Sequence, residues 1–215
     1  MNSKNKDKNK DKYKNSITLR IITIGNAGVG KTSIIKRYIS DIFDNNTLST
    51  IGIEFSSKEI TLKNGKAITL KLMDTGGQEI YRALSKSYFK NSDGVLFVFA
   101  LNNEQSFTDI SDWINYFNEN CFGNVNIPKF LIGNKCDLDS KVNKDLINKV
   151  ANDNDMKYFE TSAKDKINID NAFEEMGERL FEEYHKSGRE KGIQLKISEK
   201  PKKKGCACAT VQGNI

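Results

Sequence analysis

The chain has 215 residues, enough for one domain with a sizeable core, and its length gives no reason to expect two. Its four cysteines and single histidine are too few for a disulfide scaffold or a zinc site. No apolar run approaches the ~20 residues that cross a bilayer, and the first residues lack the apolar stretch of a signal peptide. We therefore expect a cytoplasmic protein with reduced thiols and no transition metal.

The formal charge of +6 is concentrated at the two ends of the chain. Residues 1–14 carry six lysines and two aspartates, and residues 186–204 carry eight basic and two acidic side chains, so the body between them is acidic. We predict a disordered basic arm over residues 1–15, one ordered domain over 16–185 and a flexible basic tail over 186–215. Since the basic charge lies in the tails, we expect no nucleic acid partner.

The first predicted elements are a strand, a helix and a hairpin. Residues 17–25 form a β-branched, apolar run that ends in glycine, which is typical of a buried strand, and residues 33–40 have helical spacing. Two strand-like runs follow at 53–62 and 67–73, joined through Asn64-Gly65. This dipeptide favours a tight hairpin, so we expect the two strands to be antiparallel neighbours.

The second half of the chain alternates between strands and helices. Residues 94–100 and 129–133 are nearly continuous apolar runs, typical of strands covered on both faces by helices. Residues 106–117 have helical spacing, and residues 158–163 form a final strand. The last helix has one apolar stripe, made of Ala172, Phe173, Met176, Leu180 and Tyr184. This alternation predicts an α/β domain with a mostly parallel, doubly wound sheet.

A phosphate-binding motif lies between the first strand and the first helix. GNAGVGKT fits the pattern G-x-x-x-x-G-K-[ST], which places backbone N–H groups and a helix N-terminus around phosphate oxygens. Lys31 would reach the β and γ phosphates, and the Thr32 hydroxyl would ligate Mg²⁺. The residues expected to hold the phosphates are Gly25, Asn26, Ala27, Gly28, Val29, Gly30, Lys31, Thr32 and Ser33.

Two later motifs select the base. Guanine presents its N1–H and 2-amino groups as donors, and in GNKCD the Asp137 carboxylate can accept both while Asn134 bonds N7. In ETSAK the N–H of Ala163 can donate to O6. The lysine stems of the two motifs can cover the two faces of the ring. The residues expected at the base are Asn134, Lys135, Asp137, Ser162, Ala163 and Lys164.

The motif DTGGQE and a threonine before IGIEF suggest a switch. Asp74 is placed to hold Mg²⁺ through a water, Gly77 to donate its N–H to the γ-phosphate, and Gln78 to orient an attacking water. Thr50 can put its hydroxyl on the metal when a γ-phosphate is present. Loss of that phosphate would release the segments around Thr50 and DTGGQE. These segments would then be ordered with the γ-phosphate and disordered without it, which makes a switch. The predicted catalytic residues are Gln78, Lys31 and Thr50.

These motifs, in this order over residues 16–185, resemble those of the small GTPases of the Ras superfamily, and TIGIEF with a CxC near the end resembles the Rab family. The resemblance implies a P-loop G domain with a six-stranded, mostly parallel sheet flanked by five helices. It also implies GTP, GDP and Mg²⁺ binding, slow hydrolysis, a role in vesicle traffic, and control by exchange factors and GTPase-activating proteins. Phe43 would pack against guanine. The segment contacting effector proteins would comprise Thr47, Leu48, Ser49, Thr50, Ile51, Gly52, Ile53, Glu54 and Phe55.

The sequence departs from the Rab pattern at several positions, so we interpret it as a divergent Rab or Rab-like protein. Met73 replaces a usual Trp, Thr47 a usual Tyr and Gly76 a usual Ala, and Ala27 can crowd the catalytic glutamine. The alternatives are another branch of the superfamily, a GTP-locked binding module with negligible turnover, and an ATP-using P-loop enzyme. Asp137 argues against the last of these.

The C-terminal tail carries a candidate lipid anchor. Cys206 and Cys208 follow a lysine run, although seven residues come after them, and Gln212 occupies the position that a C-a-a-X signal requires for cysteine. Lipids on these cysteines together with the basic charge would anchor the chain stably. We expect a monomer held peripherally on the cytosolic face of a membrane.

Overall fold

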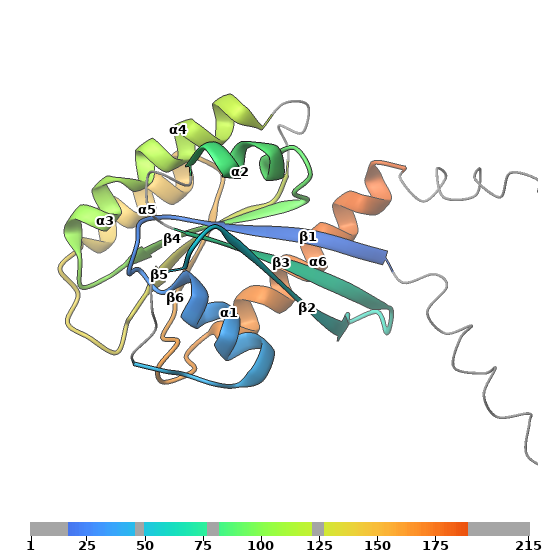
Figure 1. Cartoon of the computed structure of the whole chain (residues 1–215), viewed down its shortest axis with the longest axis horizontal. Coiled ribbons are helices and arrows are strands. Elements are labelled where there is room, and N and C mark those ends of the chain that lie inside the picture. The colour runs from blue at the N-terminus through green and yellow to red at the C-terminus, as the bar shows by residue number, and fades with distance from the viewer. Residues whose placement is uncertain (1–16, 46–49, 77–81, 122–126, 189–215) are drawn as a thin grey trace, which may run out of the picture.

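A computed structural model describes residues 17–45, 50–76, 82–121 and 127–188 of the chain (Figure 1). Six strands make one sheet in the order β2-β3-β1-β4-β5-β6. They are β1 (Ile17–Ile24), β2 (Ile53–Thr61), β3 (Ala67–Thr75), β4 (Gly94–Ala100), β5 (Lys129–Asn134) and β6 (Lys157–Glu160). Only β2 runs antiparallel to its neighbour, so the predicted six-stranded, mostly parallel sheet is confirmed.

Helices cover both faces of this sheet. They are α1 (Lys31–Ser40), α2 (Arg82–Phe89), α3 (Glu104–Thr108), α4 (Ile110–Asn120), α5 (Lys144–Asp153) and α6 (Ile169–Lys186). Figure 1 shows α1 and α6 on one side and α2, α3, α4 and α5 on the other. The expected single helix over 106–117 is divided at Asp109 into α3 and α4, so the described residues contain six helices where the resemblance implied five.

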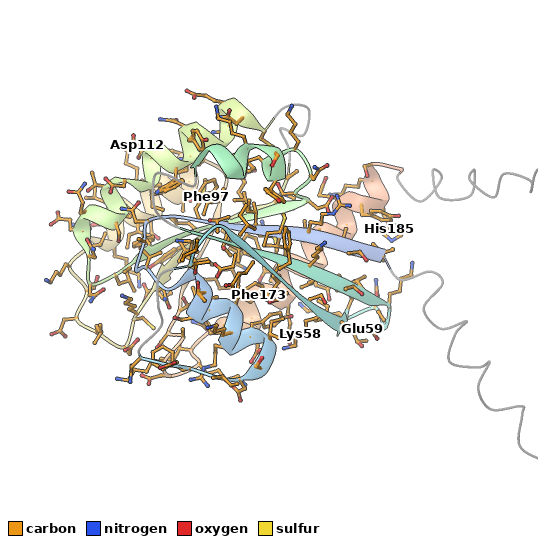
Figure 2. The ribbon with its side chains drawn as sticks, viewed as in Figure 1. Lys58, Glu59, Phe97, Asp112, Phe173 and His185 are labelled. Carbon is orange, nitrogen blue, oxygen red and sulfur yellow. The ribbon has the colours of Figure 1, made fainter. Side chains whose placement is uncertain are left out.

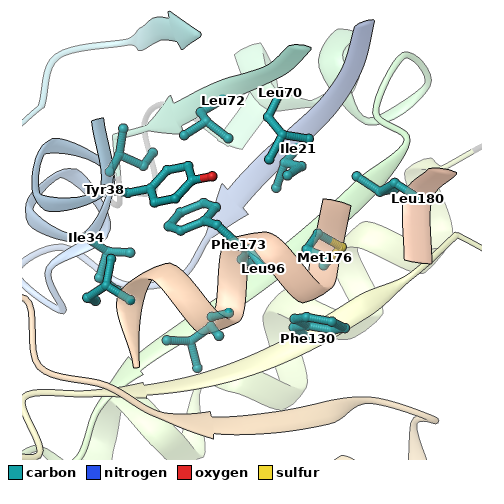
Figure 3. Close-up of a cluster of buried hydrophobic side chains, with 14 of the residues drawn as sticks. Ile21, Ile34, Tyr38, Leu70, Leu72, Leu96, Phe130, Phe173, Met176 and Leu180 are labelled. Carbon is teal, nitrogen blue, oxygen red and sulfur yellow. The ribbon is translucent and has the colours of Figure 1, made fainter. Parts of the chain in front are cut away.

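The core consists of two clusters, one on each face of the sheet. On the α1 and α6 side, the rings of Tyr38 and Phe173 stack with centroids 4.2 Å apart (Figure 3). The predicted apolar stripe of α6 is confirmed, since all five of its members are buried there. On the other side, Phe97 meets Phe117 edge to face at 5.7 Å. Figure 2 shows Phe97 and Phe173 on opposite sides of the sheet.

The predicted hairpin at Asn64-Gly65 is confirmed. Gly65 adopts φ 81°, a left-handed conformation that glycine takes without strain, and β2 and β3 pair along their whole lengths. The N–H of Gly65 donates to the carbonyl of Leu62 over 2.8 Å. No helix among the described residues is long and apolar enough to span a membrane.

The motifs gather at one edge of the sheet because the parallel strands all end there. GNAGVGKT follows β1, GNKCD begins on β5, and ETSAK begins at the last residue of β6. The carboxyl edge of an open parallel sheet is where α/β proteins of this kind bind ligands. The topology therefore brings together segments that lie more than one hundred residues apart.

Candidate functional site

A pocket of about 390 Å³ opens at this edge. It is lined by Ala27, Gly28, Gly30, Lys31, Thr32, Ser33, Phe43, Asp44, Asn45, Thr50, Thr75, Asn134, Lys135, Asp137, Leu138, Ala163 and Lys164. The phosphate loop, the two base motifs and Thr50 thus share one cavity. Asp44, Asn45, Thr75 and Leu138 were not among the predicted site residues, although Thr75 lies within the motif DTGGQE.

Two glycines of the phosphate loop are required by their surroundings. Gly25 has φ 148°, and a Cβ there would lie 2.0 Å from the carbonyl oxygen of Val98. Gly30, which precedes α1, has φ 97°, and its Cβ would lie 2.3 Å from Nδ2 of Asn134. The loop therefore passes so close to β4 and to the base motif that only hydrogen fits at these positions.

Lys31 is held inside the phosphate loop. Its Nζ donates to the carbonyl oxygens of Gly25 and Asn26, each over 2.8 Å. Burial lowers the pKa of Lys31 to about 8, an effect that the Asp74 carboxylate opposes. A phosphate beside this amine would raise its pKa again, since an anion stabilises the charged form.

Asn134 and Lys135 connect the base motif to the phosphate loop. The buried amide of Asn134 donates through Nδ2 to the carbonyl of Val29 over 2.9 Å, and Lys135 Nζ donates to the carbonyl of Gly28 over 2.8 Å. The Oδ1 atom of Asn134 accepts from the Thr161 hydroxyl and from the N–H of Ala163, both at 3.3 Å. Thr161 was not predicted as a site residue, since its role depends on a contact across the sheet edge.

The Asp137 carboxylate is oriented by the second base motif. The Ser162 hydroxyl donates to its Oδ1 over 2.6 Å, and Lys164 Nζ lies 4.0 Å from its Oδ2. Ser162 is fully buried and accepts in turn from the N–H of Asp165 over 3.0 Å, which fixes the hydroxyl. The carboxylate is therefore presented to the pocket in one orientation, as a group that recognises two donors at once must be.

Three oxygen-bearing side chains meet beside the pocket: Thr32 and Thr50, which line it, and Asp74, which does not. The Thr32 hydroxyl donates to Oδ2 of Asp74 over 2.5 Å and lies 2.6 Å from the Thr50 hydroxyl. The other carboxylate oxygen of Asp74, Oδ1, is buried and has no hydrogen-bond partner within the described ranges. Burial raises the pKa of Asp74, opposed by the Thr32 hydrogen bond and by Lys31. This set of hard oxygen donors with an unsatisfied carboxylate atom fits Mg²⁺.

The remaining predicted residues lie elsewhere or outside the described ranges. Asn26 does not line the pocket, because its side chain points to α3 and α4, where it contacts Asp109 and Trp113. In the predicted effector segment, Ile51 is 80% exposed and Phe55 48% exposed. The predictions on Thr47, Leu48, Ser49, Gly77, Gln78, Cys206 and Cys208 concern residues outside the described ranges.

The chain is similar in sequence to known proteins. The family model described as "Ras family" matches residues 20–182. Ras-related protein Rab-13 of Bos taurus is 36% identical over 184 residues, covering 85% of this chain and 86% of its own length. Ras-related protein Rab-8A of Mus musculus is 40% identical over 156 residues, covering 72% and 74%. Ras-related protein Rab-8 of Diplobatis ommata is 35% identical over 189 residues, covering 86% and 89%. The chain therefore belongs to the Ras family and is a Rab-like small GTPase, an enzyme that hydrolyses GTP.

Proposed function

We propose that the pocket binds GTP with its phosphates on the loop of residues 25–32 and its guanine between Phe43 and residues 162–164. The observation that carries this proposal is the pair of bonds from Asn134 and Lys135 to the phosphate loop. Through them the residues that recognise the base and those that hold the phosphates form one rigid unit. Asp137 then accepts from N1–H and the 2-amino group, and Ala163 donates to O6.

The metal site in this proposal consists of Thr32, Thr50 and Asp74. The two threonine hydroxyls would bind Mg²⁺ directly, and Asp74 would hold it through a water. Bound there, the metal would neutralise charge on the phosphate oxygens. The Thr50 hydroxyl lies 2.6 Å from that of Thr32, so one metal ion could contact both. Loss of the γ-phosphate and the metal would then remove contacts that hold Thr50 and the effector segment in place.

Hydrolysis requires a positioned water and charge stabilisation. Gln78 orients the water, Lys31 contacts the β and γ phosphates, and Gly77 donates to the γ-phosphate. Ala27 lines the pocket on the phosphate side, where its methyl group can crowd Gln78 and an arginine supplied by an activating protein. Such an arginine contributes about 10³ to 10⁵ in rate, so hydrolysis by the isolated chain is expected to be slow.

Single-turnover hydrolysis of GTP tests this assignment, measured with the purified chain alone and with a Rab-type activating protein. The expected result is slow hydrolysis that the activating protein accelerates, and loss of both rates in Gln78→Leu. If Gln78→Leu left both rates unchanged, the role of Gln78 would be wrong. Absence of hydrolysis under both conditions, with GTP still bound, would instead support a GTP-locked module.

The basic tail is the proposed membrane anchor. Lipids on Cys206 and Cys208, helped by the neighbouring lysines, would hold the monomeric protein on the cytosolic face of a membrane, where it recruits effectors for vesicle traffic. Exchange factors and activating proteins would set its nucleotide state. The exposed Ile51 and Phe55 support the placement of the effector surface.

Membrane fractionation of the full chain in cells tests the anchor. We expect the chain to sediment with membranes, and the double variant Cys206→Ser with Cys208→Ser to be released. Deletion of residues 209–215 tests whether these residues affect membrane binding. Stronger binding by the shortened chain would mean that they mask the cysteines, and equal binding would mean that they have no effect. Membrane binding that survives the double substitution would contradict the proposal.

A further inference from the structure

We propose that Arg37, near the end of α1, is a positioning residue for guanine recognition. Its Nε donates to the carbonyl of Ala163 over 2.7 Å, and its Nη2 donates to the carbonyl of Lys164 over 2.9 Å. Both acceptors belong to the loop that would present the Ala163 N–H to O6 of the base. This inference rests on the guanine site proposed above.

The same guanidinium also holds the chain that leads to Phe43. Its Nη1 donates to the carbonyl of Asp41 over 2.8 Å and lies 3.3 Å from the Asp41 carboxylate. Asp41 ends α1 in a left-handed conformation, with φ 57°, and comes two residues before Phe43. Lys166 adds a second connection, because its Nζ lies 3.0 Å from Oδ1 of Asp41.

Arg37 further contacts Phe43 itself. Its Cζ lies 5.9 Å from the centre of the Phe43 ring, within the range of a cation–π contact. Phe43 and Ala163 both line the pocket, so the guanidinium sits behind two of the groups that would surround the base. The side chain of Arg37 is only 15% exposed, which strengthens these charge-assisted bonds relative to bonds in water.

No other residue type makes this set of contacts. The planar fork of arginine presents donors on three nitrogens in fixed directions, whereas lysine offers one flexible nitrogen. Arg37 lies on the helix that begins at Lys31 and Thr32, the side chains proposed to hold the phosphates and the metal. One helix therefore carries the phosphate contacts at its start and the anchor of the base loop at its end. Without the hydrogen bonds from Arg37, the loop that contains Ala163 and Lys164 should be able to move away from the nucleotide.

Dissociation of fluorescently labelled GDP in the presence of Mg²⁺ provides the first test. We expect GDP to leave Arg37→Gln at least about tenfold faster than wild type, a factor equivalent to 1.4 kcal/mol. Arg37→Lys, which keeps the charge and the apolar stem, should change the rate in the same direction and serves if Arg37→Gln does not fold. Arg179→Gln is the matched control, since this arginine on α6 is 44% exposed and contacts Glu175.

The second readout separates positioning from a general loss of stability. The diphosphate of 2-aminopurine riboside lacks O6 and also the N1–H, whereas inosine diphosphate keeps both and lacks the 2-amino group. Part of the preference for GDP over the 2-aminopurine nucleotide therefore comes from Asp137 and does not depend on Arg37. If Arg37 acts through the Ala163 loop, its variants should show a reduced preference for GDP over the 2-aminopurine nucleotide and an unchanged preference for GDP over inosine diphosphate. An equal loss of affinity for all three nucleotides would overturn the inference, as would an unchanged dissociation rate.

The variant Asp137→Asn shows whether a negative result concerns Arg37 alone or the proposed guanine site as a whole. If that variant changes base preference while the Arg37 variants behave as wild type, the guanine site stands and the role of Arg37 is wrong. If neither substitution affects base preference, the guanine site itself is wrong and the inference falls with it.

Discussion

The indole N–H of Trp113 in α4 donates to Oδ1 of Asn26 in the phosphate loop over 2.6 Å. Nδ2 of the same amide donates to Oδ2 of Asp109 over 2.6 Å, and Gln105 donates to the other oxygen of that carboxylate over 2.7 Å. Asn26 therefore joins the phosphate loop to the helical layer on one face of the sheet. The phosphate loop is therefore held in place by the side chains of Trp113 and Asp109 as well as by its own backbone.

The first prediction concerns the contact between Asn26 and Asp109. A carboxylate at position 26 should destabilise the fold, and an amide at position 109 should reverse that effect. Asn26→Asp would place a carboxylate against Asp109 and should lower the free energy of unfolding by about 1–3 kcal/mol, because a partly buried acceptor loses its donor. Adding Asp109→Asn restores a donor and should recover stability to within about 0.5 kcal/mol of wild type. Urea unfolding of the nucleotide-bound protein measures both. Asp112→Asn, an exposed change in the same helical layer, is the control.

A second prediction concerns the close approach at Gly30. Gly30→Ala combines an unfavourable left-handed backbone with a Cβ only 2.3 Å from Nδ2 of Asn134, so nucleotide binding should weaken as well as folding. Gly65→Ala has a similar φ of 81° but open space around it, and should cost only the backbone strain of about 1–2 kcal/mol. Thermal unfolding and GDP affinity are measured for both. Equal effects of the two substitutions on GDP affinity would show that the contact with Asn134 does not matter.

The third prediction concerns the base. Asp137→Asn replaces an acceptor of two hydrogen bonds with an amide that can donate to the 2-oxo group of xanthine. Affinity for GDP should fall by at least about 10²-fold, since sites built around buried hydrogen bonds discriminate strongly against unmatched bases. Affinity for xanthosine diphosphate should rise in the same variant. Competition binding with GDP, xanthosine diphosphate and ADP checks this, and tight ADP binding by the wild type would contradict the guanine assignment.

The fourth prediction concerns the core beneath α1. Phe173→Ala removes a fully buried ring that stacks on Tyr38, and should lower the free energy of unfolding by about 3–5 kcal/mol. Ile42→Ala, at a side chain that is 58% exposed, should change it by less than about 0.5 kcal/mol. Denaturant unfolding compares the two variants. A loss below about 1 kcal/mol for Phe173→Ala would mean that the cluster rearranges to fill the space.

The order of the strands and helices, the hairpin at Asn64-Gly65 and the motifs predicted to hold the phosphates and the base can all be recognised in the sequence alone. These features depend on local periodicity, on the left-handed conformation that Gly65 adopts, and on motifs whose spacing is read within a few residues. The division of one expected helix at Asp109 is a small local departure from that pattern.

The contacts that hold the site together form only in the folded chain. Asn26 and Trp113 are 87 residues apart in the chain, and Arg37 and Ala163 are 126 apart. No periodicity connects positions at such separations, because the contact exists only once parallel strands have brought their carboxyl ends to the same edge. The sequence therefore specifies which side chains can recognise the nucleotide, and the packing of the sheet and helices specifies which other side chains keep them in position.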